Sequence, residues 1–109
     1  MIEIKRNGNG YTATEGDKVV ASCRFSLLPD TLVIEEIRAD TLSMYDGMFR
    51  TVADYGIQEH KLLLQLAPDV DAKPLEILGI WPLLNNPDRT CRIIQLFLQR
   101  RCDGCSMEQ

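Results

Sequence analysis

The chain has 109 residues, of which 45% are hydrophobic, and a formal net charge of −4. This length suits one compact domain, which we place at residues 1–102, followed by a flexible tail at residues 103–109. The negative charge argues against a nucleic-acid surface, because neutralising phosphates requires clustered Lys and Arg. No apolar run approaches the ~20 residues that span a bilayer. The N-terminus also lacks the apolar stretch of a secretory signal, so we expect a cytoplasmic protein with no membrane partner.

Turn residues divide the N-terminal part of the chain into four predicted strands. We expect them at residues 2–5, 11–15, 19–27 and 32–38. The turn at residues 7–10 (NGNG) is rich in residues that tolerate positive φ, which is typical of a hairpin. Because every connecting turn is short, the four strands are predicted to form an antiparallel meander.

The fourth of these strands carries two adjacent carboxylates, Glu35 and Glu36. Apolar residues occur on both of its faces, which indicates a central strand covered on two sides. Side chains alternate along a strand, so Glu35 and Glu36 are predicted to point to opposite faces, with at least one directed at a packed layer or a cleft. Two interpretations remain open: a catalytic carboxylate, or a structural ion pair with Arg24 or Arg38.

One long helix is predicted to follow this strand. Its apolar stripe recurs at helical spacing and comprises Tyr45, Met48, Phe49, Val52, Ala53, Gly56 and His60. Residues 43–46 have the form of a capping box, and Asp40 or Thr41 could equally cap the first turn. Gly56 costs roughly 1 kcal/mol relative to Ala inside a helix, so we expect close packing against the sheet to offset that cost. His60 is expected at the helix end, where its charge suits the dipole.

The rest of the chain is predicted to complete the sheet. Residues 62–66 form a strand parallel to residues 32–38, because a helical crossover joins the two. A short helix at residues 72–78 ends at Gly79. Residues 80–84 and 91–100 are predicted to form a closing hairpin, although 91–100 is ambiguous between helix and strand. The fold class is therefore α+β: a mixed, mostly antiparallel sheet with one long crossover helix and one short helix.

From about residue 17 to residue 101 this order resembles the GNAT (N-acetyltransferase) superfamily. Three segments carry the resemblance: GDKVVASCRFSL, MFRTVADYGIQEHKLLLQL and AKPLEILGI. They are similar to the second and third strands of that family, its long cofactor-side helix with the following strand, and its Leu-Gly-Phe segment. The resemblance implies a minimal GNAT acyltransferase fold.

The resemblance also implies a binding site for acetyl-CoA in the loop before the long helix, where free backbone amides face the pyrophosphate. The family pattern there is Arg/Gln-x-x-Gly-x-Gly/Ala, whereas this chain has residues 40–45, DTLSMY, a degenerate version. The residues implied in cofactor binding are Ile37, Arg38, Ala39, Thr41, Leu42, Ser43, Tyr45 and Gly47.

By the same resemblance, an amine of a small molecule or a protein would attack the thioester carbonyl directly. Glu35 or Glu36 would be the general base, and amides at residues 37–39 would polarise the carbonyl. Leu75 stands where many members have a Tyr that protonates the thiolate, so Tyr11 or Tyr45 would replace it. The implied catalytic residues are Glu35, Glu36 and Tyr45.

A second functional class stays open: a non-catalytic interaction or small-ligand module on the same fold, for which a homodimer through the C-terminal strand is one arrangement. Cys102 and Cys105 form a C-x2-C pair, but zinc requires four ligands, and only Cys23, Cys91 and His60 remain as candidates. We therefore expect no metal and four reduced thiols.

Overall fold

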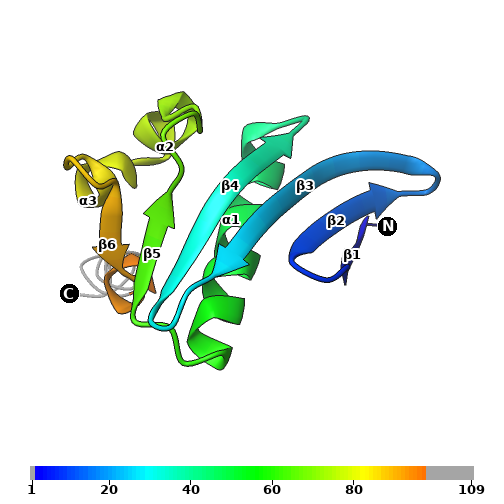
Figure 1. The fold of residues 1–109 in the computed structure, drawn as a ribbon. Coiled ribbons are helices and arrows are strands. Elements are labelled where there is room, and N and C mark those ends of the chain that lie inside the picture. Colours follow the sequence, from blue (N-terminus) through cyan, green and yellow to red (C-terminus); the bar gives the residue numbers. More distant parts are fainter. Residues whose placement is uncertain (1, 98–109) are drawn as a thin grey trace, which may run out of the picture.

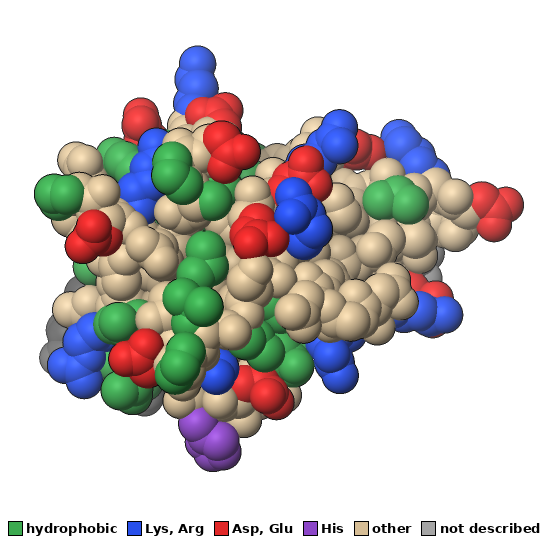
Figure 2. All heavy atoms as spheres, in the orientation of Figure 1, with side chains coloured by type: hydrophobic (Ala, Val, Ile, Leu, Met, Phe, Trp, Pro, Cys, Tyr) green, Lys and Arg blue, Asp and Glu red, His purple; other side chains and the backbone are tan. Residues whose placement is uncertain are grey.

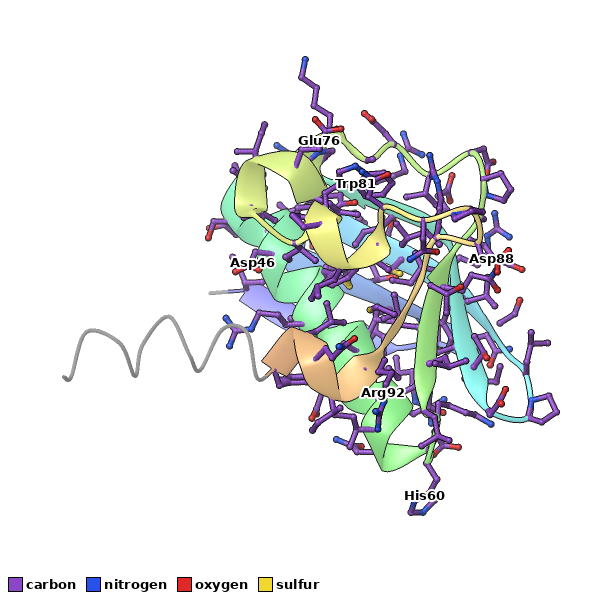
Figure 3. The ribbon with its side chains drawn as sticks, turned by 90° about the vertical axis from the view of Figure 1, so that its left-hand side faces the viewer. Asp46, His60, Glu76, Trp81, Asp88 and Arg92 are labelled. Atoms are coloured by element: carbon purple, nitrogen blue, oxygen red, sulfur yellow. The ribbon has the colours of Figure 1, made fainter. Side chains whose placement is uncertain are left out.

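The computed structural model describes residues 2–97, which form two layers (Figure 1). One layer is a six-stranded sheet. The helices all lie on one side of this sheet, as the side view in Figure 3 shows, and the other side is open. The predicted α+β class is therefore confirmed. No helix in the described part of the chain is long and apolar enough to cross a membrane.

The strands follow one another in the sheet in chain order. They are β1 (Ile2–Arg6), β2 (Gly10–Glu15), β3 (Lys18–Leu27), β4 (Thr31–Ala39), β5 (Leu63–Leu66) and β6 (Thr90–Arg92). All neighbours pair antiparallel except β4 and β5, which are parallel. The predicted meander and the predicted parallel pair are both present.

Helix α1 (Leu42–Gln58) makes the crossover between β4 and β5. Thr41 caps it, because its Oγ1 accepts a hydrogen bond from the N–H of Met44 at 3.1 Å. The capping box suggested by residues 43–46 is therefore not used. His60 is exposed beyond the helix end at φ 62°, pointing away from the molecule (Figure 3), so its place on the apolar stripe was wrong. The chain needs this left-handed residue to reverse from α1 towards β5.

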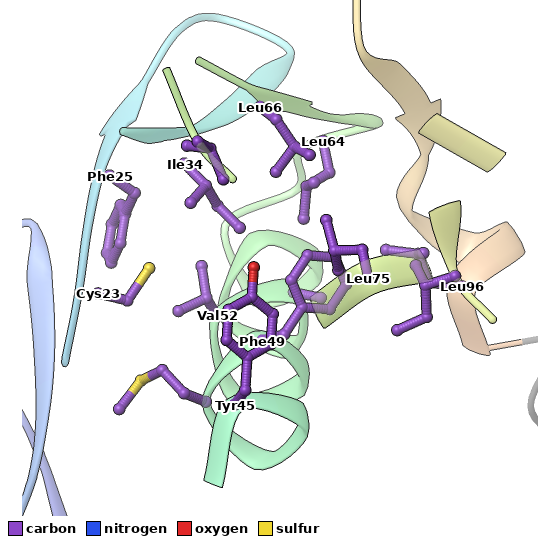
Figure 4. Close-up of a cluster of buried hydrophobic side chains, with 14 of the residues drawn as sticks. Cys23, Phe25, Ile34, Tyr45, Phe49, Val52, Leu64, Leu66, Leu75 and Leu96 are labelled. Carbon is purple, nitrogen blue, oxygen red and sulfur yellow. The ribbon is translucent and has the colours of Figure 1, made fainter. Parts of the chain in front are cut away.

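The core lies between the sheet and α1 (Figure 4). From the sheet it contains Phe25, Leu32, Ile34, Leu64 and Leu66, and from α1 it contains Met48, Phe49, Val52 and Ala53, each at most 2% exposed. Burial of such side chains contributes about 1.5–3 kcal/mol each. The contact between α1 and the β3–β5 part of the sheet therefore holds the domain together.

After β5 the chain forms α2 (Lys73–Leu78) and then α3 (Trp81–Leu84). The prediction of a strand at residues 80–84 was wrong. Pro82 lies in the first turn of α3, where its missing N–H is no loss, whereas an interior strand would need that N–H for the ladder. Leu84 at the end of α3 is fully buried.

The prediction of a strand at residues 91–100 holds only for its first residues. Strand β6 ends at Arg92, and residues 93–97 are helical. Ile93, Leu96 and Phe97 recur at helical spacing, and all three belong to the core or pack against it. The predicted hairpin with residues 80–84 was therefore wrong, since β6 pairs with β5 instead. Residues 98–109, including the expected tail and Cys102 and Cys105, lie outside the described residues.

Gly56 gives a test of how closely α1 approaches the core. A Cβ placed there would lie 2.8 Å from Cδ1 of Ile93 and 3.4 Å from Cδ1 of Leu32. We expect Gly56→Leu to lower the free energy of unfolding by about 1–3 kcal/mol, the usual cost of overpacking. Urea denaturation measures this change.

Gly47→Leu is the matched control, because Gly47 lies in the same helix and a Cβ there meets nothing within 4 Å. Its better helix propensity should raise the stability by about 0.5–1 kcal/mol. A similar gain in stability in the two variants would show that helix propensity, and not contact with Ile93 and Leu32, governs the Gly56 position.

Candidate functional site

The centre of the open face of the sheet is a β-bulge in β4. Arg24 pairs with Glu36 and Phe25 pairs with Ile34, which leaves Glu35 as the extra residue. The bulge interrupts the alternation of side chains. As a result, Glu35 and Glu36 line the same hollow on the open face. The prediction that they point to opposite faces was wrong, because a uniform period of two does not hold across a bulge.

The two carboxylates differ in their partners. Nη1 of Arg24 donates to Oε1 of Glu35 at 2.9 Å, and the hydroxyl of Ser26 donates to its Oε2 at 2.5 Å. Glu36 is exposed and forms no hydrogen bond or ion pair with residues 2–97. Figure 2 shows acidic and basic side chains gathered near the middle of this face. One carboxylate is therefore fixed in place and its neighbour is available.

Two hollows meet at Glu35. The first, about 500 Å³, lies over β2, β3 and β4 and contains both carboxylates. The second, about 570 Å³, opens beside β4 and β5 and is lined by Val33, Glu35, Gln65 and Arg89, among others. The parallel pairing ends at Ile34 and Leu66, while β4 continues to Ala39. The strands separate there, and Glu35 forms part of the wall of both hollows.

The first turn of α1 presents free backbone donors. The N–H of Met44 is used by the Thr41 cap, while those of Leu42 and Ser43 have no partner among the described residues, and both side chains are exposed. Asp40 precedes this turn, and its Oδ2 lies 3.2 Å from Nζ of Lys18. The helix end therefore offers amides and a positive dipole, and a lysine offsets part of the nearby negative charge.

The other residues implied in cofactor binding lie around this turn. Ile37, Arg38 and Ala39 form the last part of β4, so they lead directly to it. Gly47 lies further along α1, within the helix and not in the loop. The structure thus brings Thr41, Leu42 and Ser43 together at the helix N-terminus and places Gly47 beyond them.

Tyr45 lies on the other side of the sheet from the two glutamates. Its side chain is 6% exposed and packs in the core among α1 and sheet residues (Figure 4). Its hydroxyl is buried and has no hydrogen-bond partner among the described residues. Burial raises the pKa of Tyr45 to about 12, with further contributions from Cys23 and Asp71. The structure therefore does not bring Tyr45 together with Glu35 and Glu36.

Tyr11, the other aromatic candidate for an acid, also packs on the helix side, against Phe25 and Tyr55 with ring centroids 6.1 and 6.0 Å away. Burial is the main cause that raises its pKa above the ordinary value. Cys23 and Cys91 are buried too, and burial raises the pKa of each thiol to about 12. Within residues 2–97 no three His, Cys, Asp or Glu side chains gather to hold a metal.

Three cations at the site were not singled out from the sequence as functional. Lys18 reaches Asp40 from β3. Arg24 was considered only as an ion-pair partner of the glutamates. Arg89 donates from Nη1 to the carbonyl oxygens of Ala67 and Val70, at 3.2 and 2.7 Å, and so closes the rim of the second hollow. The backbone of Arg89 is left-handed, with φ 51°. The Pro-Asp turn directly before it was the sequence feature that could have drawn attention to this residue.

The chain matches no protein-family model, and no curated protein sequence matches it. Among solved structures it is similar to the ribosomal-protein-S18-alanine N-acetyltransferase from Escherichia coli. The two chains share 14% sequence identity with a TM-score of 0.56, over 73% of this chain and 54% of the other. This chain thus matches about half the length of that structure. The similarity shows a GNAT-like fold, which the sequence resemblance had predicted.

The buried hydroxyl of Tyr45 yields a prediction about stability. A buried polar group without a partner costs about 1–3 kcal/mol, so Tyr45→Phe should raise the free energy of unfolding by about 1 kcal/mol. Tyr55→Phe, on the same helix but only half-buried, should change it little. Thermal and urea denaturation of both variants measure the difference. A loss of stability in Tyr45→Phe would show instead that the hydroxyl has a partner, such as an ordered water.

Proposed function

We propose that this chain is an N-acyltransferase that uses acetyl-CoA or a related acyl-CoA as donor. The observation that carries the proposal is the bulge at Glu35, which directs two carboxylates onto the open face beside the point where β4 and β5 separate. Carboxylates on a strand next to a hollow are suited to attract an ammonium group and to remove its proton.

The donor set at the start of α1 fits the pyrophosphate of such a substrate. The N–H groups of Leu42 and Ser43 are free, the Ser43 hydroxyl is exposed, and Lys18 brings a positive charge next to Asp40. Anions bind at helix N-termini through such amides and the helix dipole. Thr41 caps the first turn of α1. Ile37, Arg38 and Ala39 form the end of β4 directly before this turn. The inward orientation of Tyr45 leaves the backbone of this turn accessible.

The first hollow is suited to hold the acceptor. Besides Glu35 and Glu36 it is lined by polar side chains from β2, β3 and the turn before β2: Asn7, Asn9, Thr12, Ser22, Arg24 and Ser26. These groups and the two acidic side chains favour a polar acceptor with a positively charged amine, from a small molecule or from a protein. The openness of this face leaves room for either.

Acyl-CoA supplies an activated acyl group as its thioester. In the transfer, the acceptor nitrogen forms a bond to the acyl carbon and the bond from that carbon to sulfur breaks. Glu35, which lines both hollows, takes the proton from the nitrogen, and Glu36 holds the ammonium form beforehand. Arg24 and Ser26 keep the Glu35 carboxylate in place. The thiolate takes its proton from solvent, since the hydroxyl of Tyr45 is buried in the core and the ring of Tyr11, whose residue lines the first hollow, packs against Phe25 and Tyr55.

A second candidate function is a non-catalytic interaction or small-ligand module on the same fold. The observation that favours this function is that the Glu35 carboxylate already accepts hydrogen bonds from Arg24 and Ser26, as a structural carboxylate does. Asp40 before α1, in place of a basic residue, also favours the non-catalytic function.

Titration calorimetry with acetyl-CoA and with CoA distinguishes the two functions. We expect micromolar binding, weakened about tenfold by Ser43→Asp, because the new carboxylate would oppose the phosphates at the helix N-terminus. Asn85→Asp makes the same charge change at an exposed position outside the site and should bind like the wild type. Absence of heat at high micromolar ligand would reject the transferase in favour of the non-catalytic module.

Glu35→Gln and Glu36→Gln separate binding from chemistry. The assay uses a panel of amines and of peptides with a free amino terminus as acceptors. The rate of CoA thiol release should fall about a hundredfold or more in Glu35→Gln, the usual contribution of a general base. Binding of acetyl-CoA should be unchanged. In Glu36→Gln the KM for the acceptor should rise with a smaller effect on kcat. The opposite result would assign the base to Glu36.

A further inference from the structure

Within residues 2–97 the outer backbone edge of β1 has no neighbouring strand, and the sequence of β1 is self-complementary. This strand is the outermost strand of the sheet, and all five of its residues are exposed. Ile2 and Ile4 are 41% and 43% exposed, unusually large apolar side chains for such an edge. A sheet edge with unpaired N–H and C=O groups is a template for pairing with another strand. We propose that β1 pairs antiparallel with β1 of a second copy of this chain, forming a homodimer.

The hairpin fixes which backbone groups of β1 face outward. The N–H of Asn7 donates to the carbonyl oxygen of Gly10 at 2.8 Å, so these two residues form the hydrogen-bonded pair that closes the turn. Hydrogen-bonded and non-hydrogen-bonded pairs alternate along an antiparallel ladder. Lys5 and Glu3 therefore bond to β2, opposite Thr12 and Thr14.

By the same alternation, the N–H and C=O groups of Ile2, Ile4 and Arg6 point away from β2. These are the groups that a second β1 would use. If the two-fold axis passes between Ile4 of each copy, the Ile4 residues form a hydrogen-bonded pair. Ile2 of each copy then pairs with Arg6 of the other in the same way. Every residue of β1 has a partner in this register.

The side chains agree with this register. Glu3 and Lys5 share the open face of the sheet, where Oε1 and Nζ lie 3.7 Å apart and both side chains are mostly exposed. About an axis at Ile4, Glu3 of each copy lies directly across from Lys5 of the other. Opposite charges in directly opposed positions stabilise a strand pair, and like charges destabilise it. Moving the axis to Glu3 or to Lys5 would place like charges across from each other.

The β1 side chains that face α1 are also consistent with this register. Ile4 lines a groove with Gly47, Thr51 and Asp54 of α1, and the guanidinium carbon of Arg6 lies 4.9 Å from the ring centroid of Tyr55. Residues 2, 4 and 6 therefore face α1. A two-fold axis perpendicular to the sheet puts both α1 helices on the same face of one continuous sheet. Ile2 and Ile4 of the two copies then meet between the helices and cover one another.

Sedimentation equilibrium of the full chain tests the proposal across the micromolar range. We expect a reversible dimer in the wild type. Glu3→Lys and Lys5→Glu, each of which opposes like charges across the axis, should raise the dimer dissociation constant about tenfold. Glu15→Lys, an exposed charge reversal at the end of β2, should leave it unchanged.

Complementation makes the test specific to this register. The double variant Glu3→Lys/Lys5→Glu exchanges the charges and should restore the wild-type dissociation constant. A mixture of the two single variants should form the heterodimer, since lysines of one copy then face glutamates of the other. A monomer throughout the micromolar range would overturn the proposal. So would a dimer insensitive to both single variants, because that dimer would use another surface.

Discussion

The parallel pairing of β4 with β5 is the constraint on which the rest of the structure depends. Two parallel neighbours cannot be joined by a tight turn, so α1 must cross over the sheet and return the chain to the starting edge of β4. The helix can do this only by burying its apolar stripe on the strands that it connects, against Leu32, Ile34 and Leu64. Gly56 permits the close approach. The core and the crossover are therefore one structural unit.

The same constraint produces the candidate site. The β4–β5 pairing covers only Thr31–Ile34 and Leu63–Leu66. Directly after this pairing, the N–H of Ala67 donates a hydrogen bond to the carbonyl oxygen of Ile34, at 2.9 Å. At the next residue, Glu35, β4 bulges on its other side against β3. A strand that loses one neighbour and bends against the other opens a hollow at that point, and the two glutamates are located there.

The sequence was sufficient to predict the elements whose pattern is local. The alternating strands before residue 40, the stripe of α1 and the crossover were visible because each has a clear period or a strong turn signal. The prediction of a strand at residues 80–84 was wrong because a short apolar run is compatible with a helix or a strand. The position of Pro82 was the better indicator of a helix start. The helix at residues 93–97 was missed because the β-branched and aromatic content of residues 91–100 was given more weight than the helical spacing of Ile93, Leu96 and Phe97.

The site was harder to predict, because its geometry depends on register. A bulge adds one residue to one strand, and the sequence around Glu35 contains no feature that indicates a bulge there. Without it, Glu35 and Glu36 would face opposite sides, and only one could act on the open face. The pairing of Lys18 with Asp40 likewise depends on which residues of β3 and β4 are neighbours. The sequence gives the chemical groups at such a site, and the register decides which of them meet.

The tight turn between β1 and β2 links the candidate site to the proposed dimer. Because only residues 7–9 separate these strands, no helix within residues 2–97 covers the open face from this side, and the outer edge of β1 has no neighbouring strand there. Pairing of two β1 strands would place both open faces on the same side of one sheet. Both pairs of glutamates would then face the same direction. A long or protein acceptor would meet a continuous surface, whereas a small amine would use one hollow alone.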